Sequence, residues 1–200
     1  PELASRAHIQ NVDHVTRQAL DAAGLTWQDL GAIAVTQGPG LAGALLVGIS
    51  YAKSLAYALG IPLVGVSHLE GHIASAWIDR PSFPRTCVVL IASGGHTHLF
   101  HATEHGGFHL MGRTIDDAAG EAFDKGAQML GLGYPGGPLI DAAARKGSPA
   151  AVRFPRSRVR TGQLDFSFSG LKTALLYHLQ RMDQEAIVRQ QADLAAGYQE

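Results

Sequence analysis

The chain has 200 residues, 46% hydrophobic and 16% charged, so it can bury one substantial core or two smaller ones and is too apolar to be disordered. A formal net charge of −1 excludes a general attraction for nucleic acid, which would have to be bound by a local basic patch. One cysteine, Cys87, excludes an internal disulfide. Because the sequence shows no leader and no run of about 18 apolar residues, we expect a cytoplasmic chain that does not enter a membrane.

The first 80 residues alternate between helical and strand-like patterns. Apolar residues at helical spacing predict a first helix that stops at Gly24, and Thr26 can cap a short turn. Strands are expected at 32–36 and 61–66, on either side of a long apolar helix that ends at Gly60. Strand, helix and strand of this character predict a parallel α/β unit with both faces covered.

The glycine-rich loop QGPG at 37–40 precedes the long helix. Free amides and the helix dipole at such a position favour an anion, although no Walker sequence follows. A tight crossover between strand and helix is an equally good interpretation.

Two prolines within 81–85 predict a domain boundary near Pro84, because they end the preceding helix and the pattern then changes to strands. Strands are expected at 87–93, 96–103 and 108–114, the first two joined by a two-residue Gly94-Gly95 hairpin with positive φ angles. Helices should follow from about 118, broken at 133–138, and again from 168 to 182 and from 184 onward. Both ends are abrupt, so we expect a chain truncated at both.

His68 and His72 lie in the run HLEGH after the second predicted strand. Four-residue spacing on a helix points both imidazoles the same way, which is half a metal site. Glu70 follows His68 by two positions, about 200° round the helix, so it cannot serve as the base that HExxH zinc proteases use. The alternative is that one histidine caps the helix and the other lies in a core or on the surface.

The run SGGHTH at 93–98 presents Ser93, two bare glycine amides and Thr97 together. This combination predicts a concave anion site, and an ordinary hairpin turn is the alternative. His96 lies beside it, whereas four further histidines are interpreted as surface or strand residues: His98, His101, His105 and His109.

Acidic residues cluster near the start of the next helix, where most of them are interpreted as capping groups: Asp116, Asp117 and Glu121. Asp124 follows an apolar pair and can present its carboxylate to a ribose. Gly136 and Gly137 permit close approach of the backbone to a ligand, and Asp141 stands one helical turn beyond.

The run VRFPRSRVR contains the one cationic cluster of the sequence. A solvated loop and a contact with RNA phosphates remain equally open interpretations. The arginines concerned are Arg153, Arg156, Arg158 and Arg160.

Six motifs occur in a fixed order: PELASRAH, TQGPGLAGALLVG, HLEGHI, SGGHT, DDAAGEAFDKGAQMLGLGYPGGP and FSFSGLKTA. With these motifs the chain resembles the TsaD family, also called Gcp and formerly described as an O-sialoglycoprotein endopeptidase. The resemblance implies the actin-like ATPase (ASKHA) fold, an α/β fold of two related domains with a nucleotide cleft between them. Residues 1–84 would be the remainder of the first domain with its HxxxH motif, and 85–200 the start of the second with the glycine hairpin and a helical insertion.

The resemblance also implies a reaction, the transfer of a threonylcarbamoyl group from threonylcarbamoyl-adenylate to the exocyclic amine of the adenosine next to the anticodon of certain tRNAs. It implies one divalent metal ion per subunit, Fe²⁺ or alternatively Zn²⁺, with His68 and His72 as ligands, and an adenylate or ATP in the cleft. The implied partners are tRNA and proteins similar to TsaB and TsaE. Substrate-binding positions are Ile91, Ala92, Ser93, Gly94 and Gly95, and nucleotide-contacting positions are Asp124, Gly137 and Asp141.

In the family, a carboxylate that completes the metal site and an asparagine that contacts the nucleotide lie beyond the position of Glu200, and a first glycine hairpin precedes Pro1. We therefore predict no transferase activity for residues 1–200 alone and assign no catalytic residue. Two alternatives remain: a zinc metallopeptidase, and a catalytically silent actin-like platform in which Ile9 and Val12 belong to a partner surface.

Overall fold

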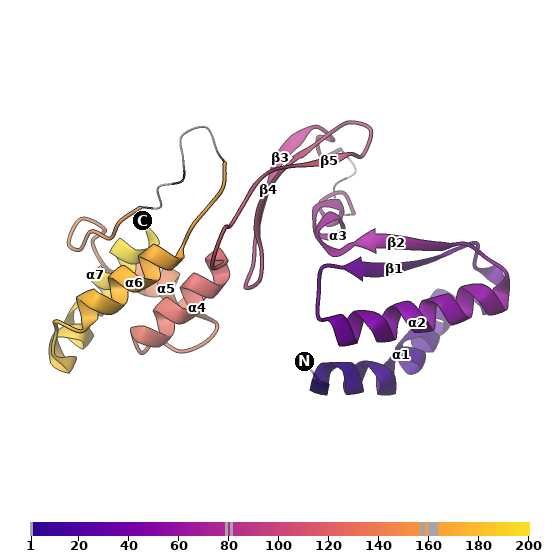
Figure 1. The fold of residues 1–200 in the computed structure, drawn as a ribbon, viewed down its shortest axis with the longest axis horizontal. Coiled ribbons are helices and arrows are strands. Elements are labelled where there is room, and N and C mark those ends of the chain that lie inside the picture. The colour runs from indigo at the N-terminus through magenta and orange to yellow at the C-terminus, as the bar shows by residue number, and fades with distance from the viewer. Residues whose placement is uncertain (1, 79, 81, 157–158, 160–163) are drawn as a thin grey trace. The chain divides into compact units, whose positions relative to one another are not determined.

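The computed structural model describes residues 2–78, 80, 82–156, 159 and 164–200 (Figure 1). The chain divides into two compact units, Pro1–Phe83 and Pro84–Glu200. Arg158 and Arg160, two of the predicted RNA contacts, lie outside the described residues.

The first unit is a parallel β–α–β unit with flanking helices. Strands β1 and β2 pair in parallel, with α2 as the connection between them. In Figure 1, α2 runs along the two strands and α1 lies against α2. The elements are α1 (Glu2–Ala23), η1 (Trp27–Asp29), β1 (Ile33–Gly38), α2 (Ala42–Leu59), β2 (Leu63–Ser67) and α3 (His68–Ser75).

The first two long helices end, and the short turn at η1 is capped, at the residues that the sequence predicts. Gly24 and Gly60 follow the last residues of α1 and α2, and both have a φ of 67°, in the left-handed region that glycine adopts without steric cost. The carboxylate of Asp29 accepts hydrogen bonds from the amide of Thr26 at 2.8 Å and from its hydroxyl at 2.7 Å, which closes the turn at η1.

The expectation that both faces of the strands are covered is wrong for the described residues. Val64 in β2 is 49% exposed, and α1 has no buried residue, with Ile9 65% exposed. The cause is that α2 and the short α3 are the helices that contact the strands, while α1 packs mainly on α2. By length and composition α2 would suffice to cross a bilayer, as many helices of soluble cores also would.

The second unit begins with an antiparallel sheet in the order β3-β4-β5, followed by helices. Ala92 pairs with Thr97, so the β3–β4 loop has four residues, Ser93–His96, and not the predicted two. Neither glycine of this loop has a positive φ, because hydrogen bonds between Ser93 and His96 close the longer loop. The strands are β3 (Cys87–Ala92), β4 (Thr97–Ala102) and β5 (Phe108–Arg113).

Four helices form the core of the second unit. Its fully buried side chains include Ile140 of α5, Leu175 of α6 and Leu194 of α7. Helix α5 begins within the predicted break at 133–138, because Pro138 falls in its first turn, where a missing N–H costs nothing. The helices are α4 (Ala119–Met129), α5 (Gly136–Ala144), α6 (Ser169–Leu179) and α7 (Gln184–Gln199).

Candidate functional site

The two candidate metal ligands lie on the solvent side of α3. Leu69 and Ile73, on the opposite side, are buried and fix the rotation of the helix. The Ser67 hydroxyl accepts a hydrogen bond from the amide of Glu70 at 3.4 Å and caps the helix directly after β2. A histidine is therefore not the cap, and His68 and His72 are both exposed.

The geometry of the pair fits a shared metal ion. The Nε2 atoms of His68 and His72 are 3.1 Å apart and their ring centroids 4.4 Å. Zinc–nitrogen bonds of about 2.1 Å in a tetrahedral site put two ligand nitrogens roughly 3.4 Å apart. The described residues offer no third histidine, cysteine or carboxylate close to the pair, so a metal ion held here would need further ligands from elsewhere.

The hairpin loop Ser93–His96 is fixed to the start of α4. The amide of Gly120 donates to the carbonyl of Ser93 at 3.1 Å, and the amide of Ala119 donates to the buried hydroxyl of Thr97 at 2.8 Å. A Cβ on Gly120 would lie 2.5 Å from the Ser93 oxygen, so only glycine permits this contact. These bonds use the first amides of α4, which leaves the loop itself as the place for a ligand.

The predicted substrate-binding residues are brought together here. Ile91 is buried and faces the sheet interior, while Ala92 and the two glycines are exposed and Ser93 is half-buried. A Cβ at Gly94 or Gly95 would meet no atom within 4 Å beyond the neighbouring residues, so the Cα atoms of both glycines border open space. The Gly94 amide nitrogen, in contrast, is packed against Gly120, whose own Cβ would lie 2.7 Å from it.

Asp124 and the start of α5 form a second group. The Oδ1 atom of Asp124 accepts a hydrogen bond from the amide of Gly136 at 2.7 Å. Gly136 is packed against the backbone of α4, whereas a Cβ at Gly137 would meet nothing within 4 Å. Of the two glycines, Gly137 is thus the one whose backbone is open to a ligand.

Asp141, one turn further along α5, is engaged with protein partners. Its carboxylate accepts hydrogen bonds from Arg145 Nε at 3.0 Å and from the Gln199 amide at 3.3 Å. These two bonds, chiefly the one from Arg145, lower the pKa of Asp141. Its predicted contact with a nucleotide would have to add to these bonds or replace them.

The sequence predicts that Asp116 caps the helix that follows it, but in the structure its carboxylate binds the start of α6 instead. Its carboxylate accepts hydrogen bonds from the Ser167 hydroxyl at 2.5 Å, the Phe168 amide at 2.7 Å, and the Ser169 amide and hydroxyl at 3.3 and 2.9 Å. Burial raises the pKa of Asp116, but these hydrogen bonds outweigh it and the net shift is downward. Next to it, Asp117 pairs with Lys172 of α6 at 2.5 Å. No local signal could reveal these pairs, because about 50 residues separate their members.

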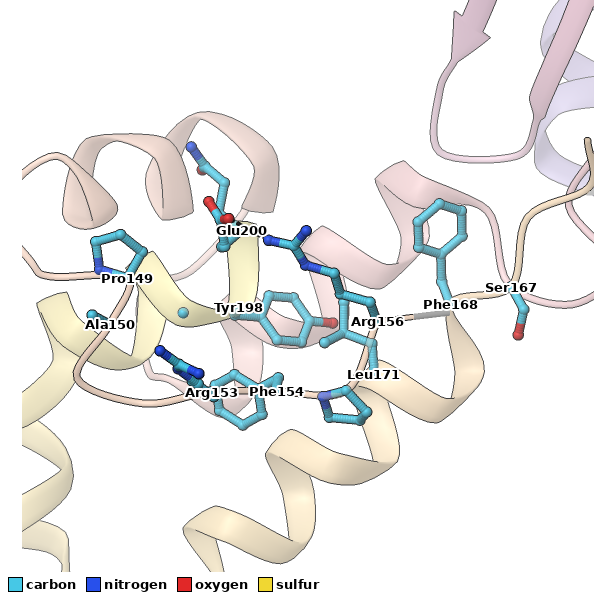
Figure 2. Close-up of a pocket in the computed structure, with 13 residues that line it drawn as sticks. Pro149, Ala150, Arg153, Phe154, Arg156, Ser167, Phe168, Leu171, Tyr198 and Glu200 are labelled. Carbon is cyan, nitrogen blue, oxygen red and sulfur yellow. Dashed lines mark hydrogen bonds and ion pairs between the residues drawn. The ribbon is translucent and has the colours of Figure 1, made fainter. Parts of the chain in front are cut away.

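The described arginines of the basic run flank a cavity of about 550 Å³ in the second unit (Figure 2). Phe154 and Tyr198 form part of its wall, with their rings 6.1 Å apart in an edge-on contact. Arg156 forms an ion pair with Glu200, while no ion pair is recorded for Arg153 within the described part of the chain. Arg153 is therefore the cation of this group best able to receive a phosphate.

The β–α–β unit with its histidine pair and the sheet with its glycine loop define an α/β protein of the actin-like ATPase fold. Residues 1–200 match the model of one family throughout, described as TsaD: tRNA N6-adenosine threonylcarbamoyltransferase, and the chain belongs to this family.

Curated relatives carry the same description. A tRNA N6-adenosine threonylcarbamoyltransferase of Clostridium perfringens (strain SM101 / Type A) is 51% identical over 199 residues, which cover all of this chain and 59% of the relative. One of Trichlorobacter lovleyi is 54% identical over 200 residues and is covered to 58%. The chain thus spans somewhat more than half the length of these relatives.

Among solved structures, YeaZ from Pseudomonas aeruginosa is 24% identical, with a TM-score of 0.41 over 56% of this chain and 52% of that one. A likeness this small bears on neither fold nor function.

Proposed function

We propose that the protein is a cytoplasmic, metal-dependent transferase that moves a threonylcarbamoyl group from threonylcarbamoyl-adenylate to the exocyclic amine of the adenosine next to the anticodon in tRNA. The observation that carries this proposal is the match of all 200 residues to the family. The convergence of the His68 and His72 nitrogens is its geometric support.

The reaction exchanges one bond at the carbamoyl carbon. The adenosine amine attacks this carbon, the new C–N bond forms, and the bond to the phosphate oxygen breaks. AMP leaves with the electron pair of that bond, and the amine gives up a proton. We assign no side chain as the acceptor of this proton, which water can take up.

His68 and His72 would hold a divalent ion, Fe²⁺ or alternatively Zn²⁺, because imidazole suits both. When bound, such an ion supplies Lewis-acid polarisation and orientation of a carbonyl oxygen. Neutral imidazole nitrogens are required for binding, and their exposure on α3 leaves them accessible.

The adenylate would be bound by the second unit. The loop formed by Ser93, Gly94 and Gly95, with Ile91 and Ala92 before it, is proposed for the acyl phosphate, because oriented amides stabilise negative charge. The Ser93 amide donates to the His96 carbonyl at 2.8 Å, so the Gly95 amide is the one proposed to face the ligand. Asp124, Gly137 and Asp141 are proposed for the nucleoside, since carboxylates bind ribose hydroxyls and an uncovered glycine admits a flat base.

Two surfaces are proposed for macromolecular partners. Arg153 and Arg156, with Arg158 and Arg160 of the same run, would contact tRNA phosphates. The exposed side of α1 is proposed for a TsaB-like protein, with a TsaE-like protein as a further partner. The surface proposed for the TsaB-like protein is supported by a groove of about 420 Å³ between α1 and α2, lined by apolar residues that include Ile9, Val12 and Leu46.

The second candidate function, an actin-like platform that binds partners and no adenylate, would use the same groove. A metallopeptidase finds no such support. Glu70 uses its amide to complete the helix cap, and no contact of its carboxylate with either imidazole is recorded within the described residues.

The test uses the full-length protein with its partner proteins, tRNA and labelled threonylcarbamoyl-adenylate. We expect His68→Ala and His72→Ala each to lose most of the bound metal and about 100-fold or more in transfer rate. Removing a direct ligand should cost at least as much as removing a residue that orients a ligand, which costs about 10–100-fold. His105→Ala, an exposed histidine in the β4–β5 turn, is the control and should match the wild type. Wild-type transfer that persists after chelation, with no metal bound, would refute the metal assignment, and failure to bind adenylate would favour the platform.

A further inference from the structure

Three cation-forming side chains gather beside the hairpin loop: His96, His98 and Arg113, referred to here as the loop-side cluster. In the sheet register, His98 of β4 lies directly opposite Ile91 of β3 and Arg113 of β5. Opposite residues of neighbouring strands share a face of the sheet, so this row places His98 and Arg113 next to a predicted substrate-binding position. The His96 and His98 ring centroids are 5.6 Å apart, which joins the loop to the row.

One nitrogen of the His98 ring is buried. Nδ1 is buried without a hydrogen-bond partner, and it is the one such side-chain atom in the described part of the chain. A buried unpaired N–H is costlier than a buried unpaired lone pair, so the ring hydrogen belongs on Nε2. His98 is therefore a neutral ring that offers Nε2–H as a donor.

The local charge favours an anion. Burial, and then the neighbouring His96 and Arg113, lower the pKa of His98. The carboxylate recorded at this end of the sheet, Asp165, accepts a hydrogen bond from the Arg113 amide at 2.9 Å. Within the described residues no ion pair is recorded for the guanidinium group, and Arg113 is exposed.

We propose that the loop-side cluster is an anion subsite that binds a phosphate or carboxylate group of the substrate. This inference rests on the proposed function, because threonylcarbamoyl-adenylate carries a phosphate and, on its threonine, a carboxylate. Arg113 can bind either group through two parallel N–H bonds, and Nε2–H of His98 adds a further donor. Gly94 and Gly95, whose Cα atoms border open space, lie at the end of the same strands.

The experiment measures binding of two probes to the full-length protein by calorimetry: AMP, which carries the phosphate, and N-carbamoyl-L-threonine, which carries the carboxylate. Removing one charged donor weakens the bound probe by about 10-fold or more. We expect Arg113→Gln to lose this affinity for one probe, and that probe identifies the group in the subsite. Arg113→Lys keeps the charge but loses the two parallel N–H donors, so it should recover only part of the lost affinity. Arg189→Gln, at an exposed arginine of α7, is the control and should bind both probes within about threefold of the wild type.

The outcomes separate this inference from the proposed function. If Arg113→Gln binds both probes as the wild type does, while Asp124→Asn weakens AMP, the adenylate site stands and the anion subsite is refuted. If no variant affects AMP or the wild type does not bind it, the proposed adenylate site fails and the subsite with it. A loss in Arg189→Gln as large as that in Arg113→Gln would show that the effect is not local to the loop-side cluster and would also refute the subsite. Loss of both probes in Arg113→Gln alone would indicate a subsite that accepts either anion.

Discussion

Gly136 and Gly137 are adjacent in the first turn of α5, yet a methyl group at each should have opposite effects on stability. A Cβ at Gly136 would lie 2.5 Å from the Asp124 Cα and 2.7 Å from its amide nitrogen, and it would also collide with the Phe123 carbonyl oxygen. These are backbone atoms, which no rotamer change can move aside. A Cβ at Gly137 would meet nothing within 4 Å.

The magnitude follows from these distances. Unstrained carbon contacts lie at about 3.5–4.0 Å, so Gly136→Ala requires α4 and α5 to separate by roughly 1 Å. Overpacking of this kind costs about 1–3 kcal/mol, and loss of the 2.7 Å bond from the Gly136 amide to Asp124 costs about 1.5–3 kcal/mol more. Alanine regains up to about 1 kcal/mol of helix propensity at either position. We therefore expect Gly136→Ala to lower the free energy of unfolding by about 1.5–5 kcal/mol, and Gly137→Ala to leave it unchanged or raise it slightly.

Urea unfolding of the two variants and the wild type, followed by circular dichroism, measures this difference. Thermal unfolding provides a second reading, because about 1 kcal/mol shifts Tm by roughly 2–4 °C for a chain of this length. The reasoning would be refuted if Gly136→Ala and Gly137→Ala unfolded within about 0.5 kcal/mol of each other, since the close approach of α4 and α5 would then not exist.

Three further results are expected. Asp116→Ala should lower the free energy of unfolding by about 1–2 kcal/mol, because it removes the cap of α6, and the exposed Glu104→Ala should have no effect in the same urea titration. The difference in unfolding free energy between the wild type and Asp116→Ala should be complete above the carboxyl pKa of the unfolded chain, about 3.9. It should shrink as pH falls through the lower pKa of Asp116 in the folded protein, and a difference that grows on acidification would contradict this reasoning. Gly120→Ala should push the hairpin loop away from α4 and weaken AMP binding, whereas Gly94→Ala, which has free space, should leave the fold intact; equal thermal stability of the two would show that the loop is not held as described.

Most secondary structure followed from local patterns. The periodicity and its glycine stops predicted α1 and α2, and alternating or continuous apolar runs predicted β1 to β5. The exceptions were local too: the β3–β4 loop proved longer than its two glycines suggested, and α5 began earlier than its Gly-Pro sequence indicated. The causes differ: hydrogen bonds between Ser93 and His96 close the longer loop, and Pro138 is tolerated in the first turn of α5, where its missing N–H costs nothing.

The sequence by itself determined the motifs, the order of elements and the convergence of His68 with His72, because helical spacing of four residues fixes that geometry without any other part of the chain. Only the tertiary structure decided which acidic residue caps which helix, which of Gly136 and Gly137 is open, and that His98 stands in a row with Ile91 and Arg113. These relations depend on segments that are distant along the chain and adjacent in space. Strand register and helix contacts set them, and neither is encoded in the spacing of neighbouring residues.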